Sequence, residues 1–179
     1  MIASFKRLRG KAAMLAMISA AIVVTIVVIA PQVPLVIYNA SGSAPLGFYR
    51  LENRLPRRGE MAVIQPPPMI ELMLVGRGIL PASVPLVKQI AATGGDEVCR
   101  SDQPNGTISI NGKVVAETYE KDRYGRPLPA WKGCMTLIDG ELFLLQPHPL
   151  SFDSRYFGPV LRCDVLGVAH PLWTWNPED

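Results

Sequence analysis

The chain has 179 residues, of which 49% are hydrophobic and 18% are charged, and its formal net charge is +3. This length suits one globular domain with an appendage, and the low charge content argues against a disordered chain. The first eleven residues hold four basic residues and no acidic one, which leaves a net charge of −1 for the rest. Because the excess positive charge belongs to this tail and not to a binding face, we expect no nucleic-acid partner.

An apolar stretch of 19 residues runs from residue 12 to residue 30. As a helix it would be about 28 Å long, close to the hydrocarbon thickness of a bilayer. The alternative is a cleaved signal peptide, but its apolar core would be about 7–15 residues long, and Pro31 and Pro34 stand where a cleavage site would be needed. By the positive-inside rule we expect a cytoplasmic tail at residues 1–11, a single-pass signal anchor in the inner membrane, and a periplasmic domain at residues 31–179.

Beyond the anchor, short β-branched runs alternate with Gly, Pro and Asn, which is typical of a mainly β domain. The predicted strands are Phe48–Glu52, Met61–Gln65, Leu86–Thr93, Thr107–Ile110, Lys113–Ala116, Leu142–Leu145 and Val160–Ala169. Asn111-Gly112 is typical of a two-residue hairpin turn between two of them. The exception is Met69–Val75, which predicts a short helix that either packs in the core or dips into the membrane interface.

Ser41 and Ser43 flank a glycine shortly after the anchor, in a stretch that Pro45 and Gly47 constrain. Such a turn can present a hydroxyl together with backbone N–H donors, although most small Ser/Gly loops are only loops.

Lys88 lies in the predicted strand Leu86–Thr93, where a period of two puts it on one face with Leu86, Ile90 and Ala92. One interpretation is a lysine whose stem packs while its ammonium reaches water. The other is a desolvated lysine, because burial lowers the pKa of an ammonium and leaves a neutral amine that can act as a general base. With a serine hydroxyl, such an amine forms a Ser–Lys acyl-transfer dyad that requires neither histidine nor a metal or other cofactor.

The segment from Ser151 to residue 159, SFDSRYFGP, contains Asp153 and Arg155, which would share a side in an extended chain and could pair. The alternative is ordinary turn chemistry. A rival triad would join His148 and Asp153 to Ser43 or Ser154. We favour it less because two prolines flank His148, with no sign of burial.

The three cysteines are not in metal-ligand spacing, and an oxidising compartment would allow one disulfide. Cys163 falls on the apolar side of a predicted strand, so we expect a buried free thiol there. That leaves Cys99 and Cys134 as the pair. Three free thiols are the alternative.

Four segments in order resemble the conserved boxes of the type I signal peptidases, which are membrane-anchored Ser–Lys endopeptidases. The boxes are Ser41–Ser43, Arg58–Ile64, Val87–Val98 and Ser151–Gly158. The spacing Asn39-x-Ser41-x-Ser43-x-Pro45-x-Gly47-x-Tyr49 and the segment Asp122–Pro129 are similar to the TraF-type conjugative-transfer peptidases of that family. The resemblance implies a signal-peptidase-like β domain behind one transmembrane helix.

The resemblance also implies a role for each residue of the candidate site. Ser43 would be the nucleophile, Lys88 the base, and Ser41 a ligand of the oxyanion. Asp153 with Arg155 would organise the site, and Ser151 would lie beside the lysine amine.

The substrate implied is a membrane-inserted precursor, most simply a conjugative pilin subunit that relatives trim and sometimes cyclise. Partners would be the lipid bilayer and proteins of the conjugation apparatus. Two alternatives stay open: a general leader peptidase, and a non-catalytic bitopic assembly protein of a conjugation or secretion channel.

Overall fold

A computed structural model describes residues 14–25, 35–103 and 105–176, and the chain divides into two units between residues 33 and 34. The first unit contains a helix at residues 14–25, in which Ser19 and Thr25 donate hydrogen bonds to carbonyls of the preceding turn. Within the described residues, no helix reaches the length and hydropathy of a membrane span. The tail at residues 1–11 and both ends of the expected anchor lie outside the described residues, so the anchor stays a prediction.

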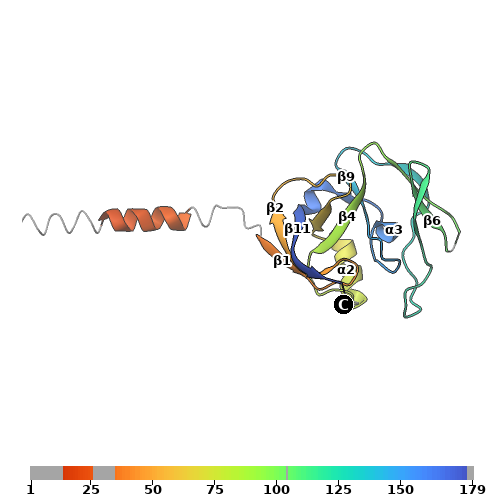
Figure 1. Ribbon diagram of the computed structural model, residues 1–179, viewed down its shortest axis with the longest axis horizontal. Coiled ribbons are helices and arrows are strands. Elements are labelled where there is room, and N and C mark those ends of the chain that lie inside the picture. Colours follow the sequence, from red (N-terminus) through yellow and green to blue (C-terminus); the bar gives the residue numbers. More distant parts are fainter. Residues whose placement is uncertain (1–13, 26–34, 104, 177–179) are drawn as a thin grey trace, which may run out of the picture. The chain divides into compact units, whose positions relative to one another are not determined.

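The second unit is built from two antiparallel sheets (Figure 1). The larger sheet has the order β1-β2-β11-β3-β4-β9-β10, and the smaller has the order β7-β6-β5-β8. The bounds in the larger sheet are β1 Val36–Asn39, β2 Leu46–Glu52, β3 Met61–Ile64, β4 Leu86–Thr93, β9 Glu141–Leu145, β10 Val160–Leu161 and β11 Val165–Trp175. Those in the smaller sheet are β5 Glu97–Arg100, β6 Thr107–Ile110, β7 Lys113–Glu117 and β8 Gly133–Thr136. The mainly β fold class is therefore confirmed.

Two apolar clusters stabilise this unit, and β9 lies between them. Leu142 and Leu144 belong to one cluster, whereas Phe143 and Leu145 belong to the other, as the period of two along a strand requires. The first cluster lies against the helix α2 (Pro68–Gly76), and the second joins the larger sheet to the smaller one. All four side chains are buried, so both faces of β9 are covered by apolar side chains.

The sequence predicted that four side chains of β4 share one face. This prediction is correct for Leu86, Lys88 and Ile90 but wrong for Ala92. The pairing of β4 with β9 shifts by one residue between Ile90 and Ala92. Such a bulge turns the following side chain to the opposite face, so Ala92 packs in the second cluster.

Helix α2 confirms the short helix expected in this region. It begins at a proline, which lacks the N–H that a first turn leaves unpaired. Ile70 and Leu74 are buried in the first cluster, while Met69 and Leu72 are exposed. The helix therefore packs on the core by one face, and contact of the other face with a membrane stays a prediction.

The region after β9 differs from the expected extended chain. Residues Ser154–Phe157 form the helical turn α3, because the Asp153 side chain caps it by accepting a hydrogen bond from the Arg155 N–H. The strand expected at Val160–Ala169 is interrupted by a 3₁₀ turn at Arg162–Asp164, where the Asp164 carboxylate accepts from the Leu161 N–H.

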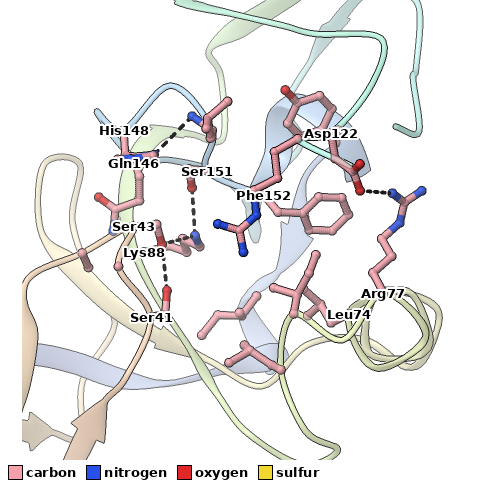
Figure 2. A pocket seen from close by; sticks show the side chains of 18 of the residues that line it. Ser41, Ser43, Leu74, Arg77, Lys88, Asp122, Gln146, His148, Ser151 and Phe152 are labelled. Atoms are coloured by element: carbon pink, nitrogen blue, oxygen red, sulfur yellow. Dashed lines mark hydrogen bonds and ion pairs between the residues drawn. The ribbon is translucent and has the colours of Figure 1, made fainter. Parts of the chain in front are cut away.

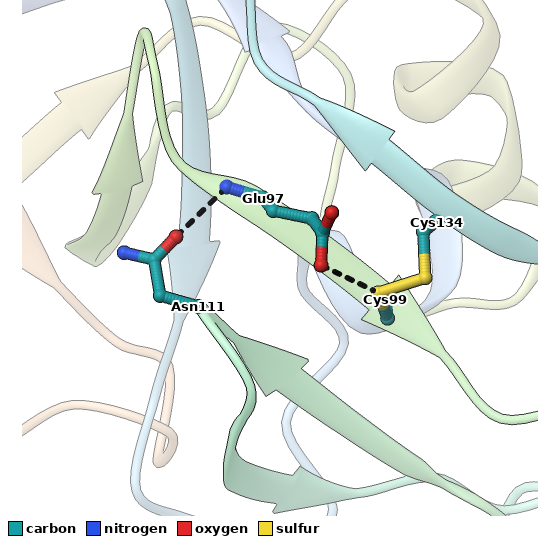
Figure 3. The surroundings of a disulfide bond; sticks show 4 residues. All are labelled: Glu97, Cys99, Asn111 and Cys134. Atoms are coloured by element: carbon teal, nitrogen blue, oxygen red, sulfur yellow. Dashed lines mark hydrogen bonds between the residues drawn. A yellow bond between two sulfur atoms is a disulfide. The ribbon is translucent and has the colours of Figure 1, made fainter.

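The structure pairs Cys99 and Cys134, which lie directly opposite each other on β5 and β8 (Figure 3). Cys163 is free, as expected, but the expectation of a buried thiol is wrong: Cys163 lies on the 3₁₀ turn and is exposed. The apolar alternation that suggested burial does not hold where the strand is broken.

Candidate active site

The Ser41–Ser43 loop connects β1 to β2, and the Asn39 side chain fixes its shape. The Asn39 carboxamide donates to the carbonyls of Ser41, Ala44 and Pro45, at 3.1, 3.3 and 3.0 Å, and accepts from the Ser41 N–H at 3.1 Å. Asn39 is itself buried, so one amide satisfies the polar groups of a tight turn without water. The loop is therefore held in one conformation before any substrate arrives.

Gly47 lets the loop return into the sheet. Its φ is +129°, and a Cβ at this position would lie 2.2 Å from the Trp173 carbonyl oxygen on β11. No other residue fits such a close approach of two backbones. Gly47 therefore sets where β2 begins relative to the serine loop.

Lys88 extends from β4 toward the serine loop (Figure 2). Its Nζ donates hydrogen bonds of 2.9 Å to Ser43 Oγ and of 2.9 Å to Ser151 Oγ. The hydroxyl of Ser41 lies 2.9 Å from that of Ser43. The structure therefore brings together four residues that the sequence placed up to 110 positions apart: Ser41, Ser43, Lys88 and Ser151.

The Lys88 side chain is only 3% exposed, which changes its chemistry. Burial lowers its pKa from the usual 10.5 to about 8, with the Asp153 charge opposing this effect and the Arg155 charge adding to it. A substantial fraction of the amine is consequently neutral near physiological pH. The alternative interpretation, a lysine with its ammonium in water, is wrong.

Asp153 and Arg155 form a buried pair beneath the loop that carries Ser151. Arg155 Nε lies 2.7 Å from Asp153 Oδ1, and both side chains are almost fully buried. The guanidinium also donates to the carbonyls of Gln146 at 2.8 Å and Pro149 at 3.1 Å, while Asp153 Oδ2 accepts from the Gln146 N–H. These contacts bind both ends of residues 146–153 and so hold Ser151 in place.

The expected direct pairing of Asp153 with Arg155 is confirmed, although in a helical turn and not in extended chain. The carboxylate contacts Arg155 and Gln146, so it acts on Lys88 through the electric field and the loop. The rival triad is not assembled. His148 is exposed and its Nδ1 accepts from the Leu150 N–H, and the buried Ser154 hydroxyl accepts from the Leu144 N–H.

A cleft of about 1310 Å³ adjoins these groups. Its apolar wall includes Leu74, Leu86 and Phe152, and the segment from Tyr119 to Leu128 forms another wall. Figure 2 shows Ser43 and Lys88 on one side of the cleft and the ion pair of Asp122 with Arg77 on the other. Ser43 and Lys88 both line this cleft, so a peptide bound in it would contact the two residues.

Sequence reasoning assigned no role to Asn39, Gln146 or Arg77. Asn39 could have been suspected, because a lone amide two residues before a serine loop is well suited to cap it. Gln146 gave no signal: its side chain donates to the Val87 carbonyl, a contact that only the pairing of β4 with β9 creates.

A family model described as "Signal peptidase, peptidase S26" matches residues 8–175. The chain belongs to the signal peptidase family S26. This peptidase is 30% identical to a plasmid transfer protein TraF of Escherichia coli over 76% of this chain and 82% of that protein. It is 33% identical to the conjugal transfer protein TraF of Agrobacterium fabrum (strain C58 / ATCC 33970), over 78% and 82%. The expected membership of the TraF type is therefore confirmed.

Another relative of this S26 peptidase is a probable conjugal transfer protein TraF of Sinorhizobium fredii (strain NBRC 101917 / NGR234), 31% identical over 78% of this chain and 77% of that protein. Among solved structures, a signal peptidase I from Enterococcus faecalis V583 aligns with a TM-score of 0.39 at 22% identity, over 65% of this chain and 98% of that one.

Proposed function

We propose that this chain is a serine endopeptidase in which Ser43 is the nucleophile and Lys88 the general base. Support comes above all from the 2.9 Å contact between Lys88 Nζ and Ser43 Oγ in a site where burial lowers the lysine pKa to about 8. A neutral amine at this distance can take the serine proton directly.

In the first step the Lys88 amine takes the Ser43 proton as Oγ attacks the substrate carbonyl carbon. The oxyanion that forms is stabilised by the Ser43 N–H and the Ser41 hydroxyl. The resulting ammonium then protonates the leaving amine, the peptide bond breaks, and an acyl ester on Ser43 remains. Ser151 orients the lysine through its 2.9 Å hydrogen bond throughout.

In the second step Lys88, neutral again, takes a proton from water as the water oxygen attacks the ester carbonyl carbon. The Lys88 ammonium then returns this proton to Ser43 Oγ as the ester bond breaks, which releases the acid and restores both side chains. A substrate amine in place of water would instead join the two ends of a peptide, giving a cyclic product. Both routes use the same groups on the enzyme.

The substrate we propose is a membrane-inserted pilin precursor of a conjugation system. Support comes from the relatives, which are named plasmid or conjugal transfer proteins. The position of Ser43 also fits, because it lies only 13 residues beyond the apolar stretch that ends at Ala30. With that stretch in the inner membrane, the site would face bilayer-inserted substrates from the periplasm.

Precursor processing in cells tests this function. Ser43→Ala and Lys88→Ala should each abolish cleavage of the pilin precursor, because either change removes one half of the proton transfer. Ser109→Ala and Lys113→Ala, which alter a serine and a lysine on β6 and β7 outside the cleft, are matched controls and should process normally. Processing at a near wild-type rate in the first pair would point to the non-catalytic assembly protein.

The family description also favours a second candidate, a general signal peptidase. Depletion of a cell's own leader peptidase separates the two. A general enzyme would rescue growth and secretion, whereas a dedicated pilin peptidase would not.

A further inference from the structure

The cleft beside the candidate dyad carries a strong excess of positive charge. Among the described residues, its lining contains five basic side chains and one carboxylate: Arg77, Lys88, Lys121, Arg123 and Arg126, with Asp122. The chain beyond its first eleven residues has a net charge of −1, so this excess is local and not a consequence of composition. A site that gathers cations against the charge of its domain is complementary to an anion.

Two of these cations, Arg77 and Arg126, are already paired with Asp122. Asp122 Oδ2 lies 3.2 Å from Arg77 Nη1 and 2.7 Å from Arg126 Nε, and Asp122 Oδ1 accepts from the N–H groups of Tyr124 and Arg126. Burial alone would raise the pKa of Asp122, but these hydrogen bonds lower it, so the group stays ionised. The network ties residues 121–127 to the end of helix α2 and makes this wall of the cleft rigid.

Lys121 and Arg123 remain without such a partner. Both are exposed, both line the cleft, and within residues 35–103 and 105–176 neither forms an ion pair. Arg123 is nevertheless held in place, because its guanidinium stacks 4.8 Å from the centre of the Tyr124 ring. The lining of the cleft therefore presents two cations that have no ion-pair partner among the described residues.

We propose that Lys121 and Arg123 bind a carboxylate of the peptide substrate and so determine specificity. The inference rests on the proposed peptidase function and names one chemical feature of its substrate. A guanidinium and an ammonium that flank one wall can hold a carboxylate by charge-assisted hydrogen bonds. That carboxylate can be an Asp or Glu side chain or the free C-terminus of the precursor. Anionic lipid headgroups are the competing ligand, and the test includes them.

Paired peptide substrates distinguish the sources. One series places Glu or the isosteric Gln at each of four positions on either side of the scissile bond of the pilin precursor, and another pair ends in a free carboxylate or an amide. The assay uses the full-length protein in detergent at low salt. In at least one pair, we expect kcat/KM for the carboxylate-bearing peptide to be about five- to tenfold higher than for its neutral partner. The effect should reside mainly in KM, because the contact is remote from the reacting atoms, and should shrink in 0.5 M NaCl.

Lys121→Gln combined with Arg123→Gln should abolish the preference, so that this variant cleaves the charged and the neutral peptide of each pair at the same rate. Lys113→Gln combined with Arg162→Gln removes two exposed cations that do not line the cleft and is the matched control. The proposal would be overturned if the wild type cleaved charged and neutral peptides at equal rates. It would also be overturned if the preference survived in the Lys121 and Arg123 double variant. A double variant that loses only its affinity for vesicles containing anionic phosphatidylglycerol would overturn it as well.

A binding measurement separates this inference from the peptidase function. Ser43→Ala protein should bind a fluorescent carboxylate-bearing peptide about five- to tenfold more tightly than its neutral counterpart, whether or not the wild type cleaves either one. If the wild type cleaves neither peptide, the peptidase proposal fails while the binding contrast still decides this one. If it cleaves both equally and Ser43→Ala is inert, only the carboxylate proposal fails.

Discussion

Lys88 is the residue on which the proposed chemistry depends, because only its neutral amine can accept a proton. Burial lowers its pKa to about 8. We therefore expect kcat/KM for peptide cleavage to rise with pH through an apparent pKa of about 8 and then to level off. Initial rates measured from pH 5 to 10.5 check this, and an apparent pKa near 10 for the rising limb would contradict the dyad.

Lys88→Arg should be inactive at every pH, since a guanidinium stays protonated.

The same burial should make Lys88 costly for folding. The folded protein loses this proton near pH 8 and the unfolded chain near pH 10.5, so below pH 8 the fold carries a destabilising buried ammonium. The difference between the two pKa values corresponds to about 3 kcal/mol. Lys88→Met should thus be inactive, yet its free energy of unfolding at pH 7 should be about 1–3 kcal/mol higher. The gain is smaller than about 3 kcal/mol because the variant loses the hydrogen bonds to Ser43 and Ser151. Urea unfolding should show this advantage fading as the pH rises from 8 to 10.5; a less stable variant at pH 7 would refute it.

Among the candidate site residues, those that interrupt a pattern could be predicted. Lys88 stood out because it breaks an apolar strand face, and Ser43 because it lies in a constrained loop. The support around them could not be found in this way. The Gln146 contact and the pairing of Arg77 with Asp122 each depend on segments that only the folded chain brings together, whereas the Asn39 cap is local and only its role went unrecognised.

At the scale of elements, the Asp153–Arg155 pair is predicted to position the loop of Ser151. Asp153→Asn should destabilise the fold by about 3–5 kcal/mol, because Arg155, 1% exposed, keeps its charge without a counterion. The same change removes a charge that raises the Lys88 pKa, so the rising limb of the pH–rate profile should move to lower pH. Removing Arg155 in Arg155→Met should move the limb the other way. If the rising limb of the pH–rate profile does not move in either variant, the pair has only a structural role.

Strands with strong apolar alternation were predictable, and β4 and β6 have the expected ends. The missed strands were β1, β5 and β8, each of four residues. Both β5 and β8 mix polar and apolar residues without a clear period, and they are held by their partners and by the Cys99–Cys134 bond. Helix α3 was missed because its single turn depends on the Asp153 cap and not on a periodic pattern.

At the scale of the whole molecule, the predicted anchor fixes the compartment of the domain. The four basic residues before residue 12 should keep the tail in the cytoplasm and place the domain in the periplasm. Protease added to spheroplasts should then digest the domain and spare an epitope fused to the N-terminus, whereas in intact cells both should survive. A domain protected in spheroplasts would reverse the topology.

An oxidising compartment also decides the state of the three thiols. The bond between Cys99 and Cys134 spans 35 residues, and closing a loop of this length stabilises the fold by about 3–4 kcal/mol in the chain-entropy estimate. Because Cys163 is exposed, it should react with a maleimide in the native protein, giving one labelled thiol before reduction and three after reduction under denaturing conditions.

Cys99→Ser should lower the free energy of unfolding by about 2–4 kcal/mol, while Cys163→Ser, the matched control, should leave it nearly unchanged. Three reactive thiols before reduction would show that the bond does not form in the cell, and the Ser43–Lys88 contact, made by β4 and the β1–β2 loop, would be unaffected.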